Sequence, residues 1–389
     1  MPPAAPTVAL PSQPLAAAGH HGQGPAENRL YILDLLRFLA ALSVVGYHVF
    51  VDNGRLWGIG VWAHWPLLGQ IFTYGWIGVE FFFVISGFVI CMSSWGRSVS
   101  EFAISRVARL MPAYVFAVLF TGAMLTLFPL AEGRPEPSHV IIDLTMLQQF
   151  LGVPSIDNVY WTLFVELKFY LIFTAVIAFG VTYRRVVMFC AAWLVASLFA
   201  LNTHSPLLTA VFEPRYSAYF VIGITLYLMY RFGQNLVLWA MLGVSGAMAL
   251  SSLIGRVADQ NQGRQIDKIE IAVAALSVFL LIMLGVALGW FDWVRWRGFV
   301  VMGALTYPVY LLHMRFSRVM LSRLGDDIPF WPMFALILGT VLLLAYLVHR
   351  FVERPLSRVL RQRLRDGLAE IRAAEPTAVP ARAVPQQPR

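Results

Sequence analysis

The stretch from Leu30 to Phe50 constrains the fold of this chain more than any other. It reads LYILDLLRFLAALSVVGYHVF and is long enough to cross a bilayer as a helix, yet it contains Asp34, Arg37 and His48. Arg37 and His48 stand eleven residues apart, about three helical turns, so the three side chains share one face. Ionisable groups in a membrane span are costly and usually face a bundle interior with a function. A structural Asp–Arg pair with an interfacial histidine is the alternative.

The composition of the whole chain is that of a membrane protein. Of its 389 residues, 59% are hydrophobic and only 13% are charged, whereas soluble domains have about 25% charged residues. We predict an all-α integral membrane protein, folded as a single bundle of about ten transmembrane helices. The ten candidate spans are residues 30–50, 71–93, 110–130, 160–180, 186–202, 208–230, 236–254, 270–290, 298–316 and 329–349.

The positions of the arginines and lysines indicate how these spans are oriented. If both termini are cytoplasmic, 18 of these residues fall in cytoplasmic segments and nine in external ones. Cytoplasmic loops of membrane proteins carry the excess of positive charge, so both termini are expected in the cytoplasm. The net charge of +8 then reflects topology, and we expect no nucleic-acid partner.

The segments that flank the apolar spans have a different composition. Residues 1–28 are rich in Pro, Ala and Gly and are expected to form a disordered N-terminal tail. Residues 29–356 form the predicted multi-span domain, and residues 357–389 form a basic and then Pro/Ala-rich C-terminal tail. The last span ends in HRFVERPL, which suits a helix stop as well as a functional motif.

Polar residues also occur in or next to other spans. Glu80 lies near the end of its span that we expect to adjoin His48, and a carboxylate beside an imidazole orients the ring and raises its basicity. Arg106 and Arg109 share a helix face and suit bidentate binding of phosphate. Ordinary positive charge at a cytoplasmic helix end explains the two arginines equally well.

Two later spans carry further candidates. Trp161, Glu166 and Lys168 lie close together in one of them, and the two charged residues cannot face each other on a helix, so each needs its own partner. Tyr307 and His313 lie in the ninth span. The two cysteines of the chain fall in apolar spans, so we expect neither a disulfide framework nor a metal site.

Six of these motifs occur in the order typical of the type 3 membrane acyltransferases, integral-membrane enzymes that O-acylate sugars and other acceptors. The chain resembles this family over roughly residues 30–356 through LDLLRFLAALSVVGYH, GVEFFFVISGFVI, FAISRVARLMPAY, WTLFVELKFY, LTYPVYLLH and FVERPL. It departs from the family at Leu35, where Gly is usual, and at Glu80, where Asp is frequent. Neither departure removes a needed functional group.

The resemblance implies a membrane-embedded O-acyltransferase. Its donor would be cytoplasmic acyl-coenzyme A, with acetyl as the expected group, and no metal is implied. Its acceptor would be a hydroxyl of a cell-envelope or exported carbohydrate. The implied location is a bacterial inner membrane, crossed several times, and the oligomeric state is left open.

The resemblance also suggests roles for the residues singled out above. Arg106 and Arg109 would hold the donor phosphates at the cytoplasmic mouth of the bundle. Arg37, paired with Asp34, would lie along the path of the donor into the bundle. His48 would act near the acyl group, either as general base towards the acceptor hydroxyl or as a transient acyl carrier.

The remaining candidates would support this chemistry. Glu80 or Glu166 would orient His48, and His313 is a second candidate base. Trp161 and Tyr307 are candidate substrate-binding residues.

One consequence and one alternative follow from this hypothesis. Arg37 and His48 lie about 16 Å apart along a helix, so the pantetheine arm of the donor would need a polar channel through the bundle. A proton-coupled transporter that uses the same intramembrane Arg, His and Glu residues is the alternative function. Transporters of that kind often have two similar halves, and none are evident in the sequence.

Overall fold

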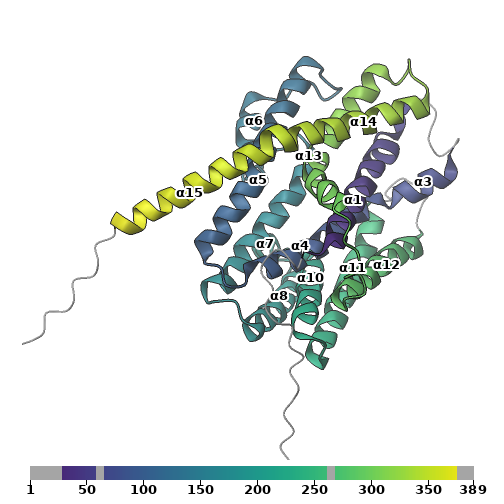
Figure 1. Ribbon diagram of the computed structural model, residues 1–389. Coiled ribbons are helices and arrows are strands. Elements are labelled where there is room, and N and C mark those ends of the chain that lie inside the picture. The colour runs from purple at the N-terminus through teal and green to yellow at the C-terminus, as the bar shows by residue number, and fades with distance from the viewer. Residues whose placement is uncertain (1–28, 58–64, 261–267, 375–389) are drawn as a thin grey trace, which may run out of the picture.

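A computed structural model describes residues 29–57, 65–260 and 268–374 of the chain as a helical bundle (Figure 1). The tail expected at residues 1–28 lies outside these ranges. Nine helical stretches in the described ranges are long and apolar enough to cross a membrane, and this confirms a multi-pass membrane bundle. Its long helices are α1 (Tyr31–Gly46), α4 (Gly78–Ser94), α5 (Val99–Leu127), α7 (Trp161–Ala178), α8 (Tyr183–Thr203), α10 (Ser217–Phe232), α11 (Leu236–Gln260), α12 (Ile269–Ala287), α13 (Gly298–Leu324), α14 (Phe330–Val348) and α15 (Arg354–Ala374).

Shorter helices interrupt or join these spans. A π-helical turn, Tyr47–Asp52, continues α1, and α3 (Pro66–Thr73), α6 (Pro137–Asp143) and α9 (Pro206–Phe212) lie in connections. The sixth candidate span, expected at residues 208–230, is divided between α9 and α10. Glu213 ends α9 in a left-handed conformation, which a continuous helix does not allow.

Helices α1 and α13 run side by side in the same direction through the centre of the bundle (Figure 1). Asp34 lies against Gly303 near the start of both helices, and the rings of His48 and His313 lie 5.2 Å apart further along. We call the end at which α1, α5 and α13 begin the tail end. The opposite end, where the π-helical turn after α1 and the loop before α7 lie, we call the loop end.

Helices α4 and α10 pack closely against each other at two glycines. A Cβ at Gly87 would overlap the backbone of Phe220, and a Cβ at Gly223 would overlap the backbone of Val84. Small residues of this kind let helix backbones approach closely inside a membrane, where packing replaces the hydrophobic driving force. The pair holds α10, nearly all of which is buried, at the core of the bundle.

Helix α5 begins eleven residues before the expected third span, at Val99 instead of residue 110. Ser98 and Glu101 form a reciprocal capping box, in which each side chain accepts a hydrogen bond from the other residue's backbone N–H. Pro112 therefore lies inside the helix rather than at its start. This extension places Arg106 and Arg109 on a regular helix.

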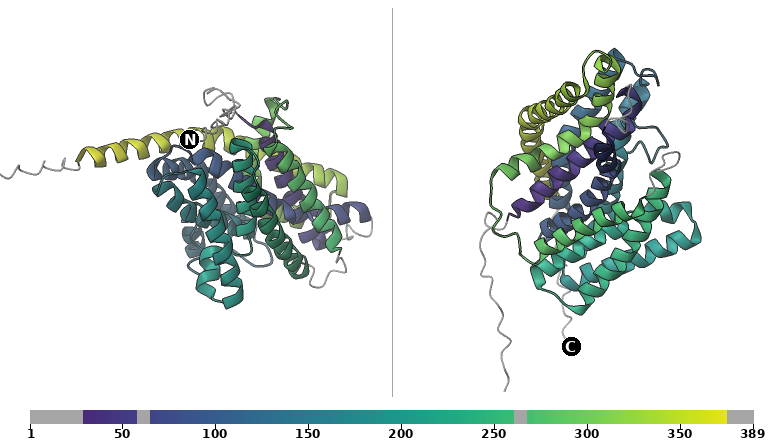
Figure 2. Two further views of the ribbon diagram at one scale, coloured as in Figure 1. Left: turned by 90° about the horizontal axis from the view of Figure 1, so that it is seen from below. Right: turned by 90° about the vertical axis from the view of Figure 1, so that its right-hand side faces the viewer.

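The last span does not stop at the Glu–Arg–Pro sequence. A π-helical turn, His349–Glu353, leads directly into α15, of which Pro355 is the second residue. The basic part of the expected C-terminal tail is thus a helix, which packs on α5 and projects past the other helices (Figure 2).

The glycine contact between α4 and α10 gives a test of this packing. We expect Gly223→Ala to lower the stability of the protein by about 1–3 kcal/mol, because the added methyl group forces two backbones apart. Gly246→Ala in α11 is the matched control, since nothing lies within 4 Å of a Cβ there. Thermal unfolding of the purified proteins in detergent measures the difference. Equal midpoints for the two variants would contradict the close approach.

Candidate active site

A cavity of about 140 Å³ lies between α1, α4, α5, α7 and α13, towards the tail end. Its polar side chains come from all five helices, while phenylalanine and aliphatic side chains complete the wall. The polar lining consists of Arg37, Ser86, Arg106, Arg109, Thr162, Glu166, Tyr170, Thr306, Tyr307 and Tyr310. Helices far apart in sequence thus converge on one polar space within an apolar bundle.

The tail end of this cavity is positively charged, because three arginines there outnumber one glutamate. Arg37 projects from α1, and Arg106 and Arg109 project from α5. Glu166 of α7 accepts a hydrogen bond from Ser86. The single carboxylate leaves the cavity with excess positive charge, which favours an anionic ligand.

Arg106 is held in place by two aromatic rings. Its guanidinium lies 5.6 Å from the ring centre of Phe102 and 6.0 Å from that of Tyr170. Its Nε is buried and has no hydrogen-bond partner among the described residues. A fixed guanidinium with an unused donor is suited to bind an anion that enters the cavity.

The opposite end of the cavity is closed by Tyr310. Its hydroxyl lies 2.8 Å from the hydroxyl of Thr162 and donates to the Val159 carbonyl at 3.2 Å. Phe82 packs edge-on against the same ring. The polar channel expected between Arg37 and His48 is therefore present only as far as Tyr310, and the closing contact includes a hydrogen bond between two hydroxyl groups.

His313 lies next to Tyr310 and is fully buried. Its Nδ1 lies 2.8 Å from the Tyr310 carbonyl and 3.2 Å from the Val309 carbonyl. Carbonyl oxygens only accept hydrogen bonds, so Nδ1 carries the proton in the neutral ring and Nε2 keeps its lone pair. Nε2 is buried and has no partner among the described residues. His313 thus presents an unused acceptor nitrogen.

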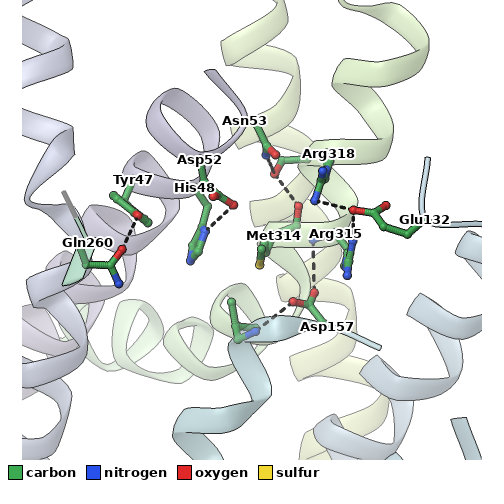
Figure 3. Close-up of polar contacts among 12 residues, drawn as sticks. Tyr47, His48, Asp52, Asn53, Glu132, Asp157, Gln260, Met314, Arg315 and Arg318 are labelled. Atoms are coloured by element: carbon green, nitrogen blue, oxygen red, sulfur yellow. Dashed lines mark hydrogen bonds and ion pairs between the residues drawn. The ribbon is translucent and has the colours of Figure 1, made fainter. Parts of the chain in front are cut away.

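His48 lies on the turn that continues α1 and points towards Asp52 (Figure 3). Its ring lies beside that of His313. Its Nδ1 is 3.5 Å from Asp52 Oδ2, and its side chain is 17% exposed. The two histidines, predicted separately, therefore form one pair, of which His48 is the member open to the loop end. The cavity, Tyr310, His313 and His48 follow one another along α1 and α13.

Polar contacts between loops and α13 hold the loop end in place (Figure 3). Asp157 accepts a hydrogen bond from the Arg315 backbone at 3.3 Å, and Glu132 forms an ion pair with Arg318 at 3.1 Å. Burial raises the pKa of the Asp157 carboxyl, and the charge of Arg315 opposes that rise. These contacts join the loop before α7 to the helix that carries His313.

Glu80 does not orient His48, and that prediction is wrong. Its carboxylate forms a buried ion pair with Arg256 of α11, whose guanidinium lies 4.7 Å from the ring centre of Trp76 and 5.7 Å from that of Trp161. Trp161 thus packs against an ion pair and does not line the cavity. Arg256 lies two residues beyond the candidate span 236–254, and nothing in the sequence links it to Glu80.

Two other predicted pairings also differ in the structure. The Asp34 carboxylate pairs with Arg29 at 2.8 Å, instead of with Arg37. Glu166 lies at the arginine cluster, where it bonds to Ser86, so it does not orient His48. Helix spacing limited the possible neighbours on one helix, but the packing of other helices decided the partners.

Tyr307, a predicted substrate-binding residue, lines the cavity, and its hydroxyl donates to the Leu110 carbonyl at 3.2 Å. Lys168 finds its separate partner in Glu213. Sequence reasoning did not assign Thr162, Tyr170 and Tyr310 to the site. Single hydroxyl groups are common on apolar helices, so their spacing alone gave no signal.

The sequence matches the acyltransferase 3 family model, described as an acyltransferase domain, over residues 30–350. It is 27% identical over 391 residues to "Acyltransferase MdmB" of Streptomyces mycarofaciens, a match that covers 87% of this chain and 94% of that protein. No solved structure gives a significant match.

Two further relatives match over shorter lengths. "Exopolysaccharide production protein ExoZ" of Rhizobium meliloti is 37% identical over 115 residues, which cover 27% of this chain and 35% of that protein. "Putative peptidoglycan O-acetyltransferase YrhL" of Bacillus subtilis is 26% identical over 167 residues, covering 38% and 24%. With the family model matching most of its length, the chain belongs to the acyltransferase 3 family and is a multi-pass membrane acyltransferase.

Proposed function

We propose that this enzyme moves an acyl group, most simply acetyl, from acyl-coenzyme A to a hydroxyl of a cell-envelope or exported carbohydrate. The observation that carries the proposal is the alignment of the arginine-lined cavity with the His48–His313 pair along two parallel helices. The relatives named for peptidoglycan O-acetylation and exopolysaccharide production support the choice of a carbohydrate acceptor.

The cavity suits the narrow part of such a donor. At about 140 Å³ it is smaller than the roughly 300–1,000 Å³ typical of sites that enclose a whole ligand. We therefore assign it to the pantetheine arm and thioester, with Arg37 and Arg109 beside the arm. The tail end then faces the cytoplasm, as the distribution of arginines predicts.

Tyr310 separates this arm from the histidines. For the thioester to reach His48, the Tyr310 ring has to turn away from Thr162. The contact joins two hydroxyl groups that can each find another partner, so its opening costs less than the opening of an ion pair. When this contact is closed, it separates the cavity from the histidine pair.

In the transfer itself, His48 acts as general base at the loop end. Its ring nitrogen takes the proton of the acceptor hydroxyl, and the acceptor oxygen attacks the thioester carbonyl. The carbon–sulfur bond breaks, the new ester forms, and coenzyme A leaves as the thiol after it accepts a proton. Asp52, 3.5 Å from His48 Nδ1, stabilises the charged imidazole. A transient acyl-histidine is the alternative role of the same residue.

The first test replaces His48. We expect His48→Ala to reduce acyl transfer at least about 100-fold, because a positioned general base contributes at least that factor. His139→Ala, in the loop helix α6, is the matched control and should keep wild-type activity. Membranes with equal amounts of each protein are given radiolabelled acetyl-coenzyme A, and label is counted in the glycan and lipid fractions. Transfer by His48→Ala at the control rate would remove His48 from the reaction.

The second test concerns the arginine cluster. We expect Arg109→Gln to raise the KM for the acyl donor about tenfold or more, with little change in the KM for the acceptor, because a hydrogen bond from the guanidinium to a carbonyl oxygen of the arm is lost. Arg184→Gln, an exposed arginine at the start of α8, is the control. Steady-state kinetics at varied donor concentration measures the change. An unchanged donor KM would place the donor elsewhere.

A further inference from the structure

A second cavity, of about 450 Å³, lies at the tail end. Arg106 lines both cavities, so the two share this residue as a common wall. The second cavity is lined by Gly96, Arg97, Glu101, Ile104, Ser105, Arg106, Arg361 and Arg365. Two of its four arginines come from α15, a segment to which neither the sequence motifs nor the reaction above gave a role.

The docking of α15 explains how these two arginines reach the cavity. Leu360, Leu364 and Leu368 recur every four residues and are partly buried, so one stripe of α15 faces the bundle. Arg372 at the far end donates a hydrogen bond to Ser100 at the start of α5. Because α15 is docked along α5, Arg361 and Arg365, one turn apart, lie together on the wall of the cavity.

The positive charge of this cavity is largely uncompensated. Among the described residues that line it, Glu101 is the only carboxylate, and that group accepts a hydrogen bond from the Ser98 backbone as part of the capping box. Four guanidinium groups against one carboxylate leave a net charge of +3. The buried Nε of Arg106, without a partner among the described residues, adds an unused donor on the shared wall.

We propose that Arg97, Arg106, Arg361 and Arg365 bind the phosphate groups of the donor's nucleotide. This inference rests on the proposed function, in which the narrow cavity takes the pantetheine arm. The adenosine end of coenzyme A carries a diphosphate and a separate 3′-phosphate. A guanidinium group can bind a phosphate through two parallel hydrogen bonds. The size of the second cavity lies within the range of sites that enclose a ligand.

An anionic lipid headgroup offers the same phosphate chemistry, so the test has to separate the two sources. Full-length protein is placed in nanodiscs of phosphatidylcholine, alone or with phosphatidylglycerol. Binding of coenzyme A and of 4′-phosphopantetheine, which lacks the adenosine nucleotide, is measured by calorimetry. The test variant is Arg361→Gln with Arg365→Gln. The control is Arg358→Gln with Arg363→Gln, which removes two exposed arginines of the same helix that do not line the cavity.

We expect the test variant to bind coenzyme A at least about tenfold more weakly than the wild type and the control, in both lipids, since charged phosphate contacts are lost. Binding of 4′-phosphopantetheine should be the same in all three proteins. Equal coenzyme A affinity in test and control variants would overturn the role of α15 and leave the proposed function intact. A loss that appears only in phosphatidylglycerol would assign the arginines to lipid. Absence of coenzyme A binding by the wild type would overturn the proposed donor and this inference together.

Discussion

A charged side chain within a bilayer needs a partner or a polar space, and the helices of this protein are arranged around that requirement. The ion pair of Arg256 with Glu80, enclosed by Trp76 and Trp161, satisfies it with a partner. The pair is buried and joins α4 to α11, although Glu80 Oε2 has no hydrogen-bond partner among the described residues. The arginines around the central cavity satisfy the requirement differently, because they outnumber their carboxylate.

That difference distinguishes structural charge from functional charge in this bundle. Arg37, Arg106 and Arg109 share one carboxylate, Glu166, and Arg106 keeps a buried donor without a partner. An excess of charge beside an enclosed space is costly unless a ligand supplies counter-charge or hydrogen-bond acceptors. The same reasoning applies to the second cavity, where α15 adds two arginines beside a carboxylate already engaged by the cap of α5.

Because α1 and α13 run parallel, the arginine-lined cavity and the histidine pair lie one after the other along the same two helices. Their starts meet at Asp34 and Gly303, and His48 meets His313 further along. The cavity lies beside the first part of the two helices and the imidazole pair beside the second, with Tyr310 between them. Tyr310, held by Thr162, the Val159 carbonyl and Phe82, thus lies between the cavity and the imidazole pair.

The sequence by itself determined the class of protein, most of the spans and the residues worth inspecting, because apolar length and isolated ionisable groups are local properties. His48, His313 and the arginines of α1 and α5 were all identified in this way. Only the tertiary structure decided their partners. Glu80 binds Arg256 across 176 residues of sequence, and α15 returns to α5 across more than 250. Contacts between distant segments depend on how the whole bundle packs, and no local pattern of residues encodes them.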